Sequence, residues 1–100
     1  MNNQIEGKPL TYAERRAYCK RVIAPYADYL QRGYTIDVLN VAADRGLRNP
    51  EGGLYTPDQI RHTKAGNLGL MELADLIAEI GRRNKEAFEK MNSEDHSIAS

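Results

Sequence analysis

Five polar side chains suited to pairing with bases gather in one short stretch, residues 55–67 (YTPDQIRHTKAGN). They surround a single strongly apolar residue, Ile60, which we expect to face the core. If the stretch is helical, the polar set faces outward, where such side chains pair with base edges in the major groove of DNA. The five residues are Gln59, Arg61, His62, Thr63 and Lys64.

Signals at both ends of this stretch predict a helix. Thr56 is a preferred N-cap residue, and Gln59 three positions later allows a capping box. Pro57 suits the first helical position, and the charge of Asp58 suits the N-terminal end of the helix dipole. Gly66 predicts the C-terminal end because glycine readily adopts a positive φ. A short helix with one apolar anchor is typical of DNA-reading helices and also of ordinary surface helices.

A second helix is predicted just before this one, over residues 36–45, with Thr35 as its cap and Gly46 at its end. A loop over residues 47–55 (LRNPEGGLY) joins the two helices, and together they predict a helix-turn-helix. The expected buried stripe of the first helix is Ile36, Leu39, Ala42 and Ala43.

In a helix-turn-helix, the N-terminal residues of the second helix meet the base edges. Gln59 would then pair with an adenine and Arg61 with a guanine. His62, Thr63 and Lys64 would reach bases or phosphates, and the helix N-terminus can itself accept a phosphate. On the loop side, Arg45 and Arg48 would contact the DNA backbone.

The remaining chain is also predicted to be helical, because alternation with a period of two is absent. A first helix begins at Thr11, with Glu14 completing a capping box, and Pro25 ends or kinks it near Ala24. A short helical piece follows over residues 25–31. Asn67 is expected to cap a long final helix from residue 68, whose apolar stripe recurs at helical spacing. That stripe is Leu70, Leu73, Ala74, Ile77 and Ile80.

The fold expected from these elements is all-α, with four or five helices, a helix-turn-helix and a long C-terminal helix. Residues 1–10 are expected to form a flexible arm, residues 11–92 a single helical domain, and residues 93–100 a disordered tail. One hundred residues suffice for one core.

The run of residues 55–67 followed by LGLMELADLIAEIGRRNKE resembles the C-terminal half of small phage-repressor-like helix-turn-helix proteins. The resemblance covers about residues 35–90. It implies a DNA-binding transcriptional regulator that acts on double-stranded DNA. The DNA-facing positions that it implies are Thr56, Gln59, Arg61, His62 and Lys64.

Composition narrows the classes of function. The 14 basic and 14 acidic residues balance, but residues 1–33 carry six basic and three acidic residues, whereas residues 67–100 carry four and seven. The single cysteine, Cys19, excludes an intramolecular disulfide, and no His/Cys spacing predicts a metal site. We expect no enzyme activity and no cofactor. The start of the chain lacks a signal-peptide core and no apolar run could span a membrane, so the expected location is cytoplasmic.

Two further interpretations concern protein partners. Six tyrosines against one phenylalanine and no tryptophan suggest a partner-binding face, so the alternative function is a protein-interaction adaptor of phage or mobile-element type. Phe88 and Met91, beyond the main stripe of the last helix, are a candidate homodimer surface. The charges of the first helix are expected to form a solvated face. These charged residues are Arg15, Arg16, Lys20 and Arg21.

Overall fold

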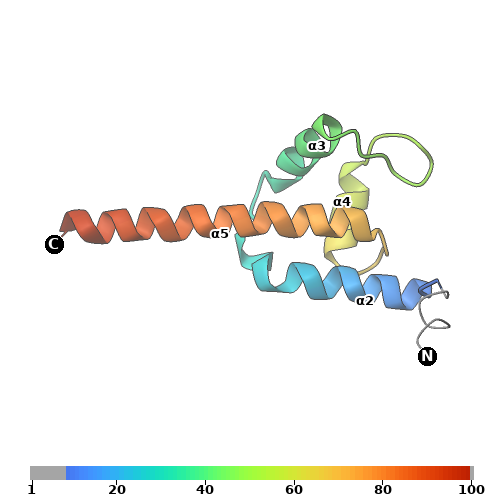
Figure 1. Ribbon diagram of the computed structural model, residues 1–100, viewed down its shortest axis with the longest axis horizontal. Helices are drawn as coiled ribbons and strands as arrows, with labels where there is room; N and C mark the ends of the chain where they lie inside the picture. Colours follow the sequence, from blue (N-terminus) through green and yellow to red (C-terminus); the bar gives the residue numbers. More distant parts are fainter. Residues whose placement is uncertain (1–8, 100) are drawn as a thin grey trace, which may run out of the picture.

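The computed structural model describes residues 9–99, with side chains for residues 9–92, and this part of the chain is all-α without strands. Four α-helices and one 3-10 helix follow one another (Figure 1). They are α2 (Tyr12–Ile23), η1 (Ala24–Tyr29), α3 (Tyr34–Asp44), α4 (Pro57–Lys64) and α5 (Met71–Ala99). The expected all-α fold with a long C-terminal helix is confirmed.

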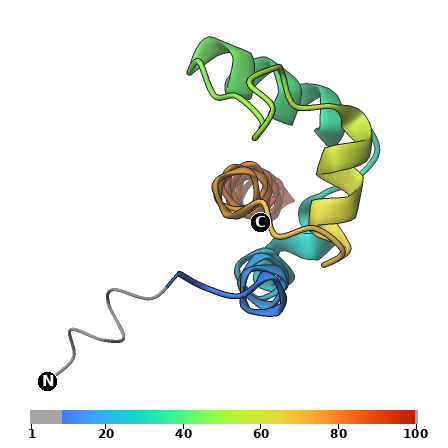
Figure 2. The ribbon, with the colours of Figure 1, turned by 90° about the vertical axis from the view of Figure 1, so that its right-hand side faces the viewer.

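Helix α5 is the axis of the structure. Figure 2 shows it end-on, with α2 on one side, α3 on the opposite side and α4 at the edge between them. The twelve most buried apolar side chains come from all of these elements, and five of them belong to α5. They are Cys19, Ile23, Leu30, Val38, Ala42, Tyr55, Ile60, Leu73, Ala74, Leu76, Ile77 and Ile80.

Helix α2 and η1 run beside α5 in the same direction (Figure 1). Tyr18 Oη donates to Asp75 at 2.7 Å, and further along, Asn84 Nδ2 donates to the Tyr29 carbonyl at 2.9 Å. Between these contacts Gly81 permits a close approach. An ideal Cβ at Gly81 would lie 2.6 Å from Tyr26 Cβ, well inside van der Waals contact. The glycine that weakens α5 as an isolated helix therefore allows η1 to pack on it.

The signals around α2 act as the sequence predicts. The Thr11 hydroxyl accepts from the Glu14 amide at 3.1 Å, and Glu14 Oε1 accepts from the Thr11 amide at 2.8 Å. Pro25 ends the α-helical ladder, since α2 stops at Ile23 and the chain continues as 3-10 helix to Tyr29.

The start and the buried face of α3 differ from the prediction. Its N-cap is Gly33, at φ 95°, and not Thr35. Val38 and Ala42 are buried, whereas Ile36 is 63% exposed. Ala43 is also exposed. The sequence of α3 is apolar on two sides, so periodicity alone does not decide which side faces α5.

Helix α5 begins at Met71, three residues later than predicted. The predicted cap, Asn67, belongs to the end of α4, because its amide donates to the His62 carbonyl at 2.8 Å. At the other end α5 extends through Ala99, into the segment 93–100 that was expected to be disordered. The predicted N-terminal arm lies outside the described residues, except for Pro9 and Leu10.

Candidate nucleic-acid interface

Helix α4 is short, and both of its ends are fixed by local hydrogen bonds. The Thr56 hydroxyl accepts from the Gln59 amide at 3.1 Å, and Gln59 Oε1 accepts from the Thr56 amide at 3.0 Å. At the C-terminal end Gly66 has φ 84°, and its amide donates to Thr63 while that of Asn67 donates to His62. This pair of bonds is a Schellman motif. The predicted helix with its capping box and glycine stop is confirmed.

The inward face of α4 consists of Ile60 and Thr63, which are both fully buried. The prediction that Thr63 contacts DNA is therefore wrong. Residues three apart lie on one face of a helix, so the side that buries Ile60 also buries Thr63. Among the described residues its hydroxyl has no hydrogen-bond partner.

The outward face of α4 carries Asp58, Arg61, His62 and Ala65, all exposed. Arg61 forms an ion pair with Asp58, three residues earlier on the same face. Lys64 sits at the edge of this face, with Nζ 5.9 Å from the centroid of the Tyr34 ring. The outward face thus offers hydrogen-bond acceptors through Asp58 near its start and hydrogen-bond donors near its end, where Arg61 and Lys64 are cationic.

The side chains of Thr56 and Gln59 form the N-terminal capping box of α4. A bidentate contact with adenine requires both the oxygen and the nitrogen of a glutamine amide. Gln59 Oε1 is engaged by the Thr56 amide and lies 3.5 Å from Asn49 Nδ2. The predicted adenine contact of Gln59 conflicts with this capping role. The Thr56 hydroxyl is likewise engaged by the cap.

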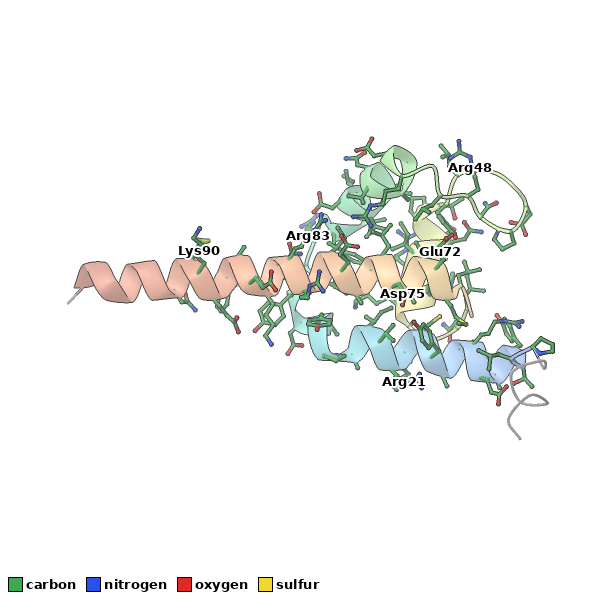
Figure 3. All side chains as sticks on the ribbon, viewed as in Figure 1. Arg21, Arg48, Glu72, Asp75, Arg83 and Lys90 are labelled. Atoms are coloured by element: carbon green, nitrogen blue, oxygen red, sulfur yellow. The ribbon has the colours of Figure 1, made fainter. Side chains whose placement is uncertain are left out.

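The two predicted backbone-contacting arginines have different surroundings. Arg45 binds Glu79 of α5 through both terminal nitrogens, at 2.9 and 2.7 Å, and thereby ties α3 to α5. These hydrogen bonds raise the pKa of Arg45 and lower the pKa of Glu79. Arg48 is exposed on the loop that follows α3 (Figure 3). The structure therefore leaves Arg48 accessible and gives Arg45 a packing role.

The loop between α3 and α4 is organised by Asn49. Its Oδ1 accepts from the amides of Glu51 and Gly53 at 3.0 and 2.9 Å, and its Nδ2 donates to the Leu54 carbonyl at 3.0 Å. The loop spans residues 45–56, much longer than the three- or four-residue turn common in helix-turn-helix motifs. It is nevertheless a closed structure that ends at the cap of α4. At the far end of the loop Tyr55 is buried, whereas Leu54 is exposed.

The sequence predicts that the charged residues of α2 form a solvated face. It does not indicate that two of them, Arg16 and Lys20, lie on the side of α2 next to α4. The Lys20 side chain packs on the turn after α4, so that an ideal Cβ at Gly66 would lie 3.3 Å from Lys20 Cδ. One turn earlier, the Arg16 guanidinium lies 5.0 Å from the centroid of the Tyr12 ring. The spacing of 16 and 20 places them on one face of α2, but only the fold shows that this face borders α4.

Most of the tyrosines make contacts within the chain. Tyr12 Oη donates to the Asn67 carbonyl at 3.0 Å, and Tyr18 Oη donates to Asp75. Tyr55 is buried beside Glu72, and its hydroxyl lies 3.4 Å from Glu72 Oε1. Burial and the nearby carboxylate raise the pKa of Tyr55. These contacts give the tyrosines a packing role and weaken the interpretation of a tyrosine-rich partner face.

Cys19 is a buried core residue, and burial raises the pKa of its thiol. A raised pKa keeps the sulfur protonated and poorly nucleophilic. Within residues 9–92 no group of three or more His, Cys, Asp or Glu side chains is arranged to hold a metal ion. None of the described helices is both long and apolar enough to cross a membrane.

Comparison of the chain with models of known protein families, with curated proteins and with solved structures gives no match.

Proposed function

We propose that this chain is a small cytoplasmic helix-turn-helix protein that binds double-stranded DNA and regulates transcription. The observation that carries the proposal is the construction of α4. Its two fully buried residues hold it to the core, its ends are fixed by local caps, and its outward face is left uncovered by the other described elements (Figure 2). A rigid helix with a free polar face meets the geometric requirement for reading the major groove.

In this proposal Arg61 reads a guanine and Asp58 accepts from the amino group of a cytosine, because these side chains offer the matching donors and acceptors. His62 and Lys64 extend the contact toward the C-terminal end of α4. Arg48, on the loop that leads into α4, reaches a phosphate. Arg45 is not assigned to DNA because Glu79 holds it.

The net charge of zero hides an uneven distribution that supports this proposal. Helices α2 and α4 together contain six basic and two acidic residues, whereas α5 contains four basic and seven acidic residues. Cationic side chains that neutralise phosphates supply most of the non-specific affinity for DNA. The side of the molecule formed by α2 and α4 is therefore the side that would face DNA.

We further propose that two copies bind together through the end of α5. This helix projects beyond the other elements (Figure 1), and Phe88 and Met91 are 52% and 61% exposed. Two copies of a helix-turn-helix protein read half-sites about one helical turn apart. Sedimentation of the protein with and without its DNA site would measure the stoichiometry.

Selection of bound sequences from a pool of random duplex DNA, at low and at physiological salt, tests the proposal. We expect an enriched motif, and we expect Arg61→Ala to weaken binding to that motif by about 1–3 kcal/mol. Arg82→Ala is the matched control, since Arg82 is equally exposed and also lies near a carboxylate, but sits on α5. The DNA proposal is abandoned if the wild-type protein retains no duplex at low salt.

The alternative proposal is a protein-interaction adaptor of phage or mobile-element type. One observation favours it, the exposed Phe88 and Met91 on the projecting part of α5, beside a groove that Tyr29 and Tyr34 also line. Such an apolar contact depends little on salt, whereas DNA binding weakens steeply as salt rises. The salt dependence of partner binding therefore separates the two functions.

A further inference from the structure

We infer that the flank of α2 next to α4 is a second DNA-contacting surface, in which Arg16 and Lys20 hold the phosphate backbone that borders the groove read by α4. This inference rests on the proposed DNA-binding function and extends it to an element outside the helix-turn-helix.

The flank of α2 that carries Arg16 and Lys20 lies next to the turn after α4. Tyr12, Arg16 and Lys20 follow one another at intervals of four residues, so they form a row along one face of α2. The row borders the turn after α4 at two points. Lys20 packs on Gly66, and the Tyr12 hydroxyl donates to the Asn67 carbonyl at 3.0 Å. The outward face of α4 and the row on α2 are therefore separated only by this turn.

The charges of this flank favour an anionic partner. Among the described side chains, neither Arg16 nor Lys20 forms an ion pair with a carboxylate. Glu14, the only acidic residue of α2, is engaged in the capping box. Arg16 is half-buried above Tyr12, so its guanidinium is held in place, while Lys20 is exposed. Two cations without carboxylate partners on one helix face suit an anionic partner.

The dimensions of the DNA groove fit this arrangement of α2 and α4. The major groove of B-form DNA is about 12 Å wide and admits one helix of about 10–12 Å diameter. A second helix packed at about 8–10 Å from the first then lies at the edge of the groove, where the phosphates are. Ala13 and Ala17, which follow Tyr12 and Arg16 by one position each, are exposed beside this row. Their small side chains leave room for a broad partner.

Lys20→Gln and Arg21→Gln form a matched pair for the test. Both changes remove one positive charge from the same helix, but Arg21 lies over the Tyr18 ring on the outer side of α2 (Figure 3). Binding of the full chain to a random-sequence duplex of defined length is measured over a range of salt concentrations. Arg16→Gln/Lys20→Gln is measured as well, with circular dichroism to verify that the double variant is folded.

We expect Lys20→Gln to reduce the slope of log affinity against log salt by about 0.9, and the double variant to reduce it by about twice that amount. Arg21→Gln should leave the slope nearly unchanged. Equal effects of Lys20→Gln and Arg21→Gln would overturn the inference, because the charges would then act only through the overall field. Equally tight binding of polyglutamate would also overturn it, and would indicate an acidic protein as the partner.

The two proposals fail in distinguishable ways. Absence of any duplex binding by the wild-type protein overturns both. A sequence motif that depends on Arg61, together with an unchanged salt slope for Lys20→Gln and for the double variant, retains the reading role of α4 and overturns only the role of α2.

Discussion

Helices α4 and α5 pack against each other but bury their side chains in very different proportions. The first half of α5 is covered by α2, α3 and α4, and it buries Leu73, Ala74, Leu76, Ile77 and Ile80. Helix α4 fully buries only Ile60 and Thr63, and Asp58, Arg61 and His62 on its outward face are exposed. Changes along the first half of α5 should therefore alter stability, whereas changes on the outward face of α4 should alter binding with little effect on stability.

The same contrast exists within α5 itself. Its first half is surrounded, but its C-terminal part projects past the other elements (Figure 1). A helix gains most of its stability in a protein from packing an amphipathic face, so the projecting part is the less stable part of α5.

The largest expected effect is that of Ile77→Ala. Ile77 is fully buried in the core cluster, so the substitution removes apolar contacts and leaves a cavity. The free energy of unfolding should fall by about 2–5 kcal/mol in chemical denaturation. Met91→Ala on the projecting half of the same helix is the control, and it should change stability by less than about 0.5 kcal/mol. Similar losses for both variants would contradict the division of α5 into a packed and a projecting half.

Gly81→Ala tests how closely η1 approaches α5. In an exposed helix this change would stabilise by about 1 kcal/mol, because alanine favours helix more than glycine does. Here the new Cβ would lie 2.6 Å from Tyr26 Cβ and 3.1 Å from its carbonyl oxygen. We expect a net loss of about 1–3 kcal/mol from overpacking. A stabilised variant in thermal denaturation would show that η1 does not press on α5 at this point.

The bounds of the elements could be predicted where the signals are local. Helix α4 begins where its capping box indicates and ends where Gly66 indicates, because these interactions join residues within six positions of each other. The predicted start of α5 was wrong because an asparagine such as Asn67 can either cap the following helix or complete the Schellman motif of the preceding one. The buried side of α3 was predicted only in part. Ala42 is buried and Leu39 is partly buried as expected, but Ile36 and Ala43 are exposed, because two sides of α3 are apolar and tertiary packing decides between them.

The candidate site was predictable only in part. Arg61 and His62 lie on the exposed face as expected, since their distance from Ile60 along the helix places them outward. Thr63 was misassigned although its spacing of three residues from Ile60 places it on the buried face of α4. Arg45 was misassigned because its partner, Glu79, lies on α5, which is distant in sequence. Arg16 and Lys20 were missed for the same reason, since no local signal tells which helix borders α4.

Thr63→Val sharpens the contrast between the two faces of α4. The Thr63 hydroxyl is buried without a hydrogen-bond partner among the described residues, and such a group costs about 1–3 kcal/mol. Valine has nearly the same shape, so we expect the variant to be more stable by about 1 kcal/mol, with unchanged affinity for DNA. A loss of DNA affinity at unchanged stability would restore Thr63 to the reading face.

The smallest expected effect concerns Glu79, where α5 holds α3 through charge at a partly exposed edge. Glu79 accepts two hydrogen bonds from Arg45, and Arg83 Nη2 lies 2.6 Å from its Oε2. The bonds to Arg45 lower the pKa of Glu79 below its value in the unfolded chain. A lowered pKa means that the stabilisation is fully present above the ordinary glutamate pKa of about 4.3 and is lost as the pH falls through the folded-state value.

Glu79→Gln should therefore be less stable than the wild-type protein at pH 6, and the difference between them should shrink as the pH falls toward 3. Glu86→Gln is the control, because Glu86 lies 4.0 Å from Arg82 within α5 and joins no second element. The wild-type protein and the control should lose stability in parallel over this range, because both retain Glu79. Urea denaturation at each pH measures the difference. A difference between wild type and Glu79→Gln that stays constant with pH would contradict this prediction, because the stabilisation would then not depend on the charge of the Glu79 carboxylate.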